Sequence, residues 1–135
     1  MDTATWDRLA TEPGSSSAEE VAQVVPVGTP VVKAFNTTFA NTLLEGQVEV
    51  QQLDVPIAGD DEAAKQKVAQ LVADGGLRPV DVGPLERPLE LEHLGFLHIS
   101  PQEPHNLGFR SAIKLYPVVG SFRRGVELQP RRACR

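Results

Sequence analysis

Hydrophobic and polar positions alternate most clearly between residues 48 and 82, where they predict a strand, a helix and a second strand. Within residues 48–58 the alternation is clearest from residue 53 onward, where every second position is apolar, as is typical of a strand. These apolar positions are Leu53, Val55 and Ile57. Pro56 has no N–H for a sheet ladder, so this strand either lies at an edge near that point or is locally broken.

The helix expected next covers Glu62–Asp74, and both of its ends carry signals. Asp60 or Asp61 can accept hydrogen bonds at its start, and Gly75-Gly76 ends it. Lys65 can pair with Asp61 one turn away. The apolar positions at helical spacing are Ala64, Val68, Leu71 and Val72. A strand over residues 77–82 completes a β-α-β unit, for which we expect parallel strands and a right-handed crossover.

An almost continuous apolar run, Val31 to Phe35, precedes this unit and stops abruptly at Asn36-Thr37-Thr38. Such a run is typical of a strand that is covered on both faces in a parallel sheet. The carboxyl ends of strands are where open α/β sheets bind ligands, so the polar turn is a candidate binding segment. The alternative is that these side chains only form a turn and cap the next helix.

Shorter helices are expected on either side of this strand. Ser17 and Glu20 fit the spacing of a capping box, and the helix that they begin ends at Pro26. We expect its apolar face to consist of Val21, Val24 and Val25. Thr37 or Thr38 can cap a second helix, Phe39 to Glu45, which ends at Gly46.

After Pro84 the apolar positions return to helical spacing. They are Leu85, Leu89, Leu91, Leu94 and Leu97, and Pro88 fits only a first turn. Residues 100–106 are expected to form a loop, and residues 107–115 a last short helix. We expect residues 1–14 to form a loose lead and 117–135 an irregular Arg-rich tail, with the folded domain over 15–116.

Composition sets the scale of this fold. The chain has 135 residues, of which 41% are hydrophobic and 23% charged, enough for one domain with a core. We find neither an apolar run long enough to span a bilayer nor a secretory signal, so we expect a cytoplasmic protein without a membrane partner. Cys134 is the only cysteine, which excludes a disulfide within the chain and a site built from several cysteines.

Charge is unevenly distributed along the sequence. Five of the 13 Lys and Arg residues lie in the last 13 residues with one of the 18 acidic residues, which leaves 8 basic against 17 acidic residues before them. The acidic body should repel nucleic acid, and five arginines without aromatic neighbours or a recognition fold are weak evidence for binding it. We therefore expect no nucleic-acid partner.

Motifs that carry chemistry are mostly absent. The glycines form neither G-x-G-x-x-G nor a P-loop. His93 and His98 are five positions apart, which does not bring two imidazoles to one helix face, so no metal site is expected. Ser15, Ser16 and Ser17 lie at a helix start rather than in a nucleophile elbow. The pattern therefore predicts no catalytic residue.

Four segments, taken in order, resemble the carboxyl-terminal half of the deazaflavin (coenzyme F-420)-dependent NADP oxidoreductases, an NADP-binding Rossmann family. They are SSSAEEVAQVVP, VVKAFNTTFA, LDVPIAGDDEAAKQKVAQLVADGGLRPVDVGPL and ELEHLGFLHI, and VVKAFNT together with IAGDD is the most specific part. The resemblance implies a partial Rossmann-like α/β domain of three layers with a mainly parallel sheet. The amino-terminal half that carries the glycine loop is missing from this pattern, as in a shortened gene product.

The same resemblance implies the function. Members of the family transfer a hydride between NADP(H) and a deazaflavin or flavin, and the cofactors supply most of the chemistry. It implies that the nicotinamide and the acceptor meet at Ala34, Phe35, Asn36, Thr37 and Thr38, and that residues 98–109 close the acceptor side. The partners would be a dinucleotide and a redox acceptor, with a companion Rossmann subunit supplying the glycine loop. The alternative is a non-catalytic fragment that associates with itself or with another subunit through its strand edges.

Overall fold

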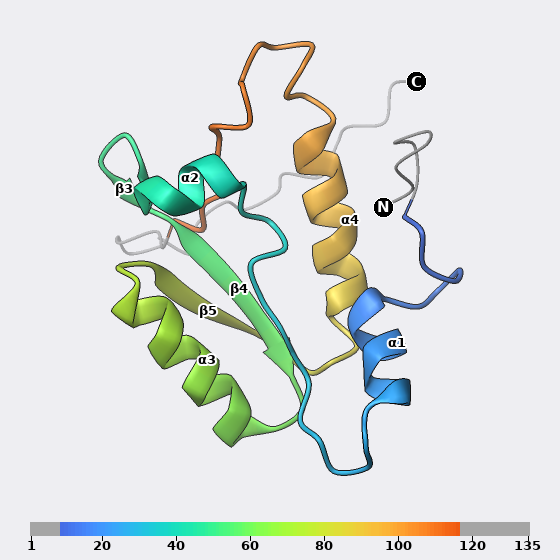
Figure 1. Ribbon diagram of the computed structural model, residues 1–135. Helices are drawn as coiled ribbons and strands as arrows, with labels where there is room; N and C mark the ends of the chain where they lie inside the picture. Colours follow the sequence, from blue (N-terminus) through green and yellow to red (C-terminus); the bar gives the residue numbers. More distant parts are fainter. Residues whose placement is uncertain (1–8, 117–135) are drawn as a thin grey trace, which may run out of the picture.

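The computed structural model describes residues 9–116, and the predictions for residues 1–8, for the Arg-rich tail 117–135 and for Cys134 lie outside that range. In chain order the elements are α1 (Ser17–Val24), β1 (Val32–Lys33), α2 (Ala40–Glu45), β2 (Gln47–Val48), β3 (Gln51–Gln52), β4 (Asp54–Gly59), α3 (Glu62–Asp74), β5 (Arg78–Gly83) and α4 (Pro88–Ile99). The α/β class predicted from the sequence is confirmed (Figure 1).

The main sheet has the strand order β1-β4-β5 and is mixed, with parallel pairing between β4 and β5 and a short antiparallel pairing at β1. β4 and β5 are parallel, with Asp54 opposite Arg78, as the β-α-β prediction requires. β1 runs antiparallel to β4 at the edge of the sheet and pairs only through Val32 and Lys33. The predicted long parallel strand covered on both faces is therefore wrong, because Phe35 has a φ of 63° and turns the chain out of the sheet.

The strand predicted over residues 48–58 is divided in two. A small antiparallel hairpin, β2 and β3, turns at Glu49, whose φ is 53°, before β4 begins. Within β4, Pro56 lies beyond the two residues that pair with β1, Ala58 and Gly59. β4 is the central strand, but at Pro56 it pairs only with Val80 of β5, so the sheet is open on the β1 side at the position where proline has no N–H to donate.

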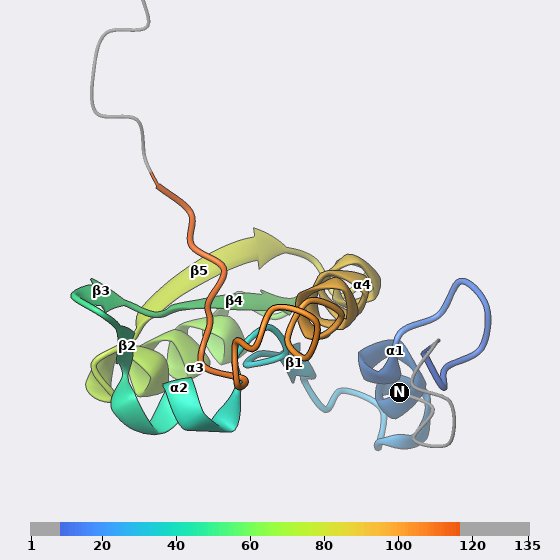
Figure 2. The same cartoon turned by 90° about the horizontal axis from the view of Figure 1, so that it is seen from above.

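The apolar core lies between β4 and α3. It consists of the buried side chains Leu53, Val55, Ile57, Val72 and Leu77, against which half-buried residues of β1, β2 and α3 pack. α3 covers this face of the sheet, whereas α4 lies on the opposite side of β4 (Figures 1 and 2). The alternating positions of the sequence are the ones that fill the core.

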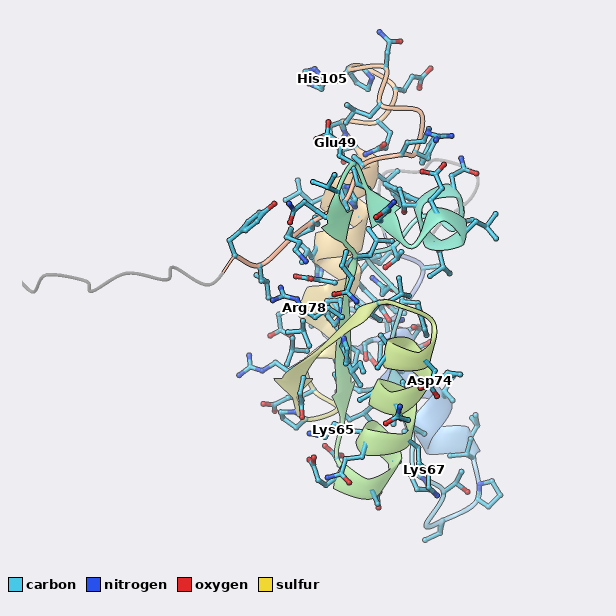
Figure 3. The ribbon with its side chains drawn as sticks, turned by 90° about the vertical axis from the view of Figure 1, so that its left-hand side faces the viewer. Glu49, Lys65, Lys67, Asp74, Arg78 and His105 are labelled. Carbon is cyan, nitrogen blue, oxygen red and sulfur yellow. The ribbon has the colours of Figure 1, made fainter. Side chains whose placement is uncertain are left out.

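Both ends of α3 lie where they were predicted, but its buried face and the ion pair of Lys65 differ from the prediction. Asp61 accepts a hydrogen bond from the backbone N–H of Ala64 at 2.7 Å, and Gly75 follows the last turn. Leu71, expected in the core, is 65% exposed. Lys65 pairs with Asp81 on β5 at 2.6 Å, not with Asp61 as expected, and it leaves α3 on a different side from Lys67 (Figure 3).

α1 and α2 begin differently from the expectation. The capping box of α1 is Ser16 with Glu19, one residue earlier than predicted, because the side chain of Ser17 is engaged elsewhere. Val21 and Val24 are exposed, so the predicted apolar face of α1 is wrong. α2 ends at Gly46 in a left-handed conformation as expected, but Phe39 precedes it and neither threonine caps it.

α4 carries Pro88 in its first turn, where proline is tolerated. The last helix predicted, residues 107–115, does not form, because Asn106, Gly108 and Phe109 all have positive φ and interrupt a helix there. The chain instead extends back to the sheet, where Lys114 Nζ lies 2.8 Å from the Asp54 carboxylate. No helix among residues 9–116 is long and apolar enough to cross a membrane.

Asp54 holds this last segment in place. Arg78 forms an ion pair with Asp54, and the backbone N–H of Leu115 donates a hydrogen bond to the Asp54 carboxylate at 2.9 Å. Burial alone would raise the pKa of Asp54, but the hydrogen bonds from Arg78 and Lys114 hold this pKa well below its usual range. The carboxylate is therefore charged and fully paired on the face of the sheet opposite to α3.

Candidate functional site

The predicted binding segment, residues 34–38, forms a tight turn directly after β1. Phe35 has a positive φ, and its carbonyl accepts a hydrogen bond from the backbone N–H of Thr38 at 3.2 Å. Ala34 and Phe35 pack against the apolar core. Their side chains thus anchor the turn, and Asn36 and Thr37 lie toward α4.

Asn36 is fixed against α4 by two features. Its Nδ2 donates to the carbonyl oxygen of Leu91 at 2.7 Å. Gly95 lies beneath it so closely that a Cβ atom there would be 2.6 Å from Asn36 Nδ2 and 2.8 Å from its carbonyl oxygen. A glycine at position 95 therefore allows the turn to approach the helix backbone, one full turn after Leu91.

Thr37 is buried, and its backbone lies beside the side chain of His98 on α4. The His98 ring lies 4.5 Å from that of Phe39 between centroids, and its Nε2 is 2.9 Å from Ser111 Oγ. Its Nδ1 has no hydrogen-bond partner among the described residues. Burial lowers the pKa of His98, which favours the neutral imidazole.

An ion pair links β1, α4 and the start of α1. Lys33 Nζ lies 2.7 Å from Glu92 Oε1 and 2.8 Å from Ser17 Oγ. The Ser17 hydroxyl donates to Glu92, and its backbone N–H lies 3.0 Å from the same carboxylate. Burial alone would raise the pKa of Glu92, but Lys33 and Ser17 lower it below its ordinary value. Glu92 is therefore charged, and its negative charge is paired with the ammonium group of Lys33.

These groups line a cavity of about 150 Å³ between α1, the turn and α4. Its lining residues are Leu9, Thr11, Ser17, Lys33, Asn36, Glu92, Gly95, Phe96 and Ile99. Glu92, Phe96 and Ile99 follow one another at i, i+4 and i+7, so they form one face of α4. The cavity thus has polar groups on one side and apolar groups on the other.

Of the five residues predicted for the site, only Asn36 lines this cavity. Ala34 and Phe35 contact the core, and Thr37 is 7% exposed. Ser17, Lys33 and Glu92 were not predicted as a group from the sequence. Lys33 interrupts the apolar run from Val31 to Phe35, and a single charge in such a run is a signal for a buried ion pair. Glu92 carries no such signal, because Glu90 lies two positions before it.

The segment expected to close the acceptor side, residues 98–109, lies next to the turn. Phe109 meets the ring of Phe39 edge to face at 5.3 Å between centroids. An open hollow of about 470 Å³ lies along this segment, lined by Gln102, Glu103, Asn106, Gly108 and Phe109. Phe39 therefore connects the turn, His98 and this outer segment.

Two other features of residues 9–116 bear on ligand binding. A hollow of about 530 Å³ lies between residues 9–15 and α4, beside Leu89 and His93. No group of three or more His, Cys, Asp or Glu side chains within residues 9–116 is arranged to share a metal ion.

Solved structures show which proteins share this arrangement. A protein from Arthrobacter sp. FB24 with the provisional name "F-420 dependent NADP-reductase" matches 82% of this chain with a TM-score of 0.68 and 25% sequence identity. A hypothetical protein from Sinorhizobium meliloti matches 58% of the chain with a TM-score of 0.52 and 34% identity. The match covers 50% of the first protein and 38% of the second, so this chain spans about half or less of their lengths.

No family model matches the sequence. The structural likeness to the first protein nevertheless extends over 82% of this chain. The chain therefore has a Rossmann-like α/β fold.

Proposed function

We propose that this chain forms the acceptor side of a site that transfers a hydride between NADP(H) and a deazaflavin or flavin. The nicotinamide and the acceptor would meet at Ala34, Phe35, Asn36, Thr37 and Thr38. The observation that carries the proposal is the likeness, over 82% of this chain, to a protein named as an F-420-dependent NADP reductase.

The geometry of the turn supports this role. Hydride transfer depends mainly on how closely and at what angle the two cofactors are held, because the cofactors themselves carry the electrons. The turn is rigidly placed, since Asn36 is bonded to Leu91 and packed on Gly95. A rigid backbone at the end of a strand is suited to fixing such a distance.

Binding of a whole dinucleotide would require a phosphate site in addition to the cavity beside Asn36. The cavity beside Asn36 holds about 150 Å³, below the roughly 300–1,000 Å³ of pockets that enclose whole ligands of drug size. The sequence contains no glycine loop for a pyrophosphate. We propose that this half supplies the reacting end of the site, and that an amino-terminal glycine-loop half or a companion Rossmann subunit supplies the phosphate site.

The test is a titration of the purified chain with NADPH, followed by nicotinamide fluorescence and by the thermal midpoint, with FMN and a deazaflavin then added to measure NADPH oxidation. Saturable binding raises the midpoint by mass action. Asn36→Ala is expected to weaken binding and turnover, whereas Asn41→Ala, an exposed position on α2, leaves both unchanged. If NADPH neither binds nor is oxidised, with or without a glycine-loop partner, the proposal is wrong.

A second candidate function is association through the sheet edge. Among the described residues β4 is the only strand that pairs with β5, so the outer edge of β5 is available to another strand. A non-catalytic chain that pairs with itself or with a companion subunit there would sediment as a dimer or a complex. A monodisperse monomer with cooperative unfolding would argue against this function.

A further inference from the structure

We propose that residues 110–116 form a strap that ion pairs at Asp54 hold closed. The strap opens as one unit about residues 106–109 and so gates the hollow of about 470 Å³ beside them. It passes from the end of α4 back to β4, where the backbone N–H of Leu115 meets the Asp54 carboxylate (Figure 2). The inference does not depend on hydride transfer, because it concerns how this segment is held and not what the site binds.

Side chains, rather than a strand ladder, hold the strap in place. Among the described residues, no backbone–backbone hydrogen bond joins positions 111–116 to another segment. Near the start of the strap, Ser111 Oγ lies 2.9 Å from His98 Nε2 and 2.8 Å from Gln102 Nε2. Near its end, the strap is bound by Asp54. A segment without a ladder can leave the sheet without breaking any strand pairing.

Asp54 binds the end of the strap through charge. Lys114 Nζ lies 2.8 Å from the Asp54 carboxylate and 2.6 Å from the carbonyl oxygen of Gln52. Arg78 pairs with the same carboxylate and also donates to the carbonyl oxygen of Leu115 at 2.6 Å. The Asp54 side chain is only 3% exposed, so its contacts are largely shielded from water and strengthened by the low local dielectric. One buried carboxylate thus holds both the side chain and the backbone of the strap.

Apolar burial contributes little to closing the strap. Leu115 and Tyr116 are 54% and 66% exposed, and Ile113 is half-buried. The Arg110–Glu45 pair joins the strap to α2, but both side chains are exposed, so water and salt weaken the pair. The ion pairs at Asp54 therefore decide whether the strap stays closed.

The segment before the strap has the backbone of a hinge. Asn106, Gly108 and Phe109 have φ values of 52°, 62° and 54°. Glycine adopts this left-handed conformation at no cost and asparagine adopts it readily, but a bulky phenylalanine is strained there. Phe109 is kept in this conformation by the ring of Phe39 and by a hydrogen bond from its N–H to Gln102 Oε1 at 3.1 Å. Opening relieves the strain, so the closed state relies on the contacts that follow the hinge.

Movement at the hinge changes the outer hollow. Phe109 is both a hinge residue and part of the lining of this hollow. When the strap opens, Phe109 leaves the ring of Phe39, and Ser111 leaves the imidazole of His98. Both rings then face the hollow, so the state of the strap sets its size.

The experiment follows hydrogen exchange of single backbone amides in the full chain, labelled with nitrogen-15, at low urea concentrations. The amides of Leu115 and Phe109 should exchange through one common opening, with equal protection and little dependence on urea, because the strap exposes little surface. The amides of β4 should be better protected and depend steeply on urea, since they exchange only on global unfolding.

Asp54→Asn keeps the shape of the side chain and removes its charge. It should lower the protection of Leu115 and Phe109 by the same factor, about tenfold or more, because Lys114 and Arg78 lose their counter-charge. The ring resonances of His98, which lies on α4, should shift as well because Ser111 moves with the strap.

Two further variants bracket this result. Lys114→Gln leaves Asp54 paired with Arg78 and should lower the protection of both amides by a smaller common factor. Asp74→Asn, an exposed position on α3, is the matched control and should leave both amides unchanged.

Three results would overturn the strap. The first is a urea dependence of Leu115 and Phe109 equal to that of β4, which would mean that the segment opens only when the whole domain unfolds. The second is a loss of protection at Leu115 alone in Asp54→Asn, which would mean that the segment does not move as a unit. The third is unchanged protection in that variant, which would mean that Asp54 does not hold the strap closed.

Discussion

α3 and α4 are held against the rest of the molecule by different forces. Toward α3 the contacts are apolar, made by buried side chains such as Val55, Ile57 and Val72. Toward α4 they are polar: the Lys33–Glu92 pair, the Asn36 amide on Leu91 and the His98 network. Apolar contacts stabilise without fixing direction, whereas buried polar groups are costly unless their partners are correctly placed. The α3 side therefore provides stability and the α4 side a defined geometry, which is what a binding site requires.

The largest effect is expected when the buried ion pair on the α4 side is broken. Lys33→Met leaves the Glu92 carboxylate buried without its counter-charge and should lower the free energy of unfolding by about 3–5 kcal/mol in urea titrations. The double variant Lys33→Met with Glu92→Gln should recover most of that loss. Equal losses in the single and double variants would show that the charge imbalance is not the cause.

On the α3 side, Ile57→Ala removes a side chain that is 1% exposed. The lost burial and the cavity left behind should lower the free energy of unfolding by about 2–5 kcal/mol in the same titrations. Leu71→Ala, on the exposed side of α3, is the control and should change it by about 0.5 kcal/mol or less. A comparable loss in both variants would mean that the core does not lie where Ile57 is buried.

Gly95→Ala tests how closely the turn approaches α4. The added Cβ would lie 2.6 Å from Asn36 Nδ2, so the turn must move, at a cost of about 1–3 kcal/mol. The amide resonances of Asn36 should shift at the same time. Gly75→Ala, where φ is −76° and the nearest atom would be 3.4 Å away, should leave both measurements near those of the wild type.

The smallest effect concerns pH. Because the folded state lowers the pKa of His98 below 6.5, the unfolded chain binds more protons between that lowered pKa and 6.5. The free energy of unfolding should therefore rise with pH across this window, by at most about 1.4 kcal/mol per pH unit, and be lost again as the solution is acidified. Urea titrations at several pH values should show a weaker dependence for His98→Gln, and His105→Gln, at an exposed position, should retain it. An unchanged profile in His98→Gln would assign the dependence to other groups.

The sequence was most informative where structure depends on local order along the chain. The alternation of Leu53, Val55 and Ile57 predicted the buried strand, and Asp61 with Gly75 predicted both ends of α3. These features follow from side-chain periodicity and backbone capping, which act within a few residues. Leu71 shows the limit, because a helical repeat gives the spacing of apolar positions but not how wide a face the sheet covers.

The candidate site was accessible from the sequence only in part. Asn36 was predicted from its place after an apolar strand, and it lines the cavity. Ser17, Lys33 and Glu92 lie far apart in the sequence, and a helix start, a strand and a helix must first be packed before they meet. The same holds for the failed helix over residues 107–115, whose chain extends because Asp54 on the sheet binds it.

The sequence by itself therefore determined the α/β class, the β-α-β unit, the core of β4 and the ends of α3. Only the tertiary structure decided that β1 is a short antiparallel edge, that Asn36 rests on Gly95, and that an ion pair lines the cavity beside them. The physical reason is range: periodicity and capping are local, whereas the pairing of buried charges and the approach of one backbone to another depend on segments that only folding brings together.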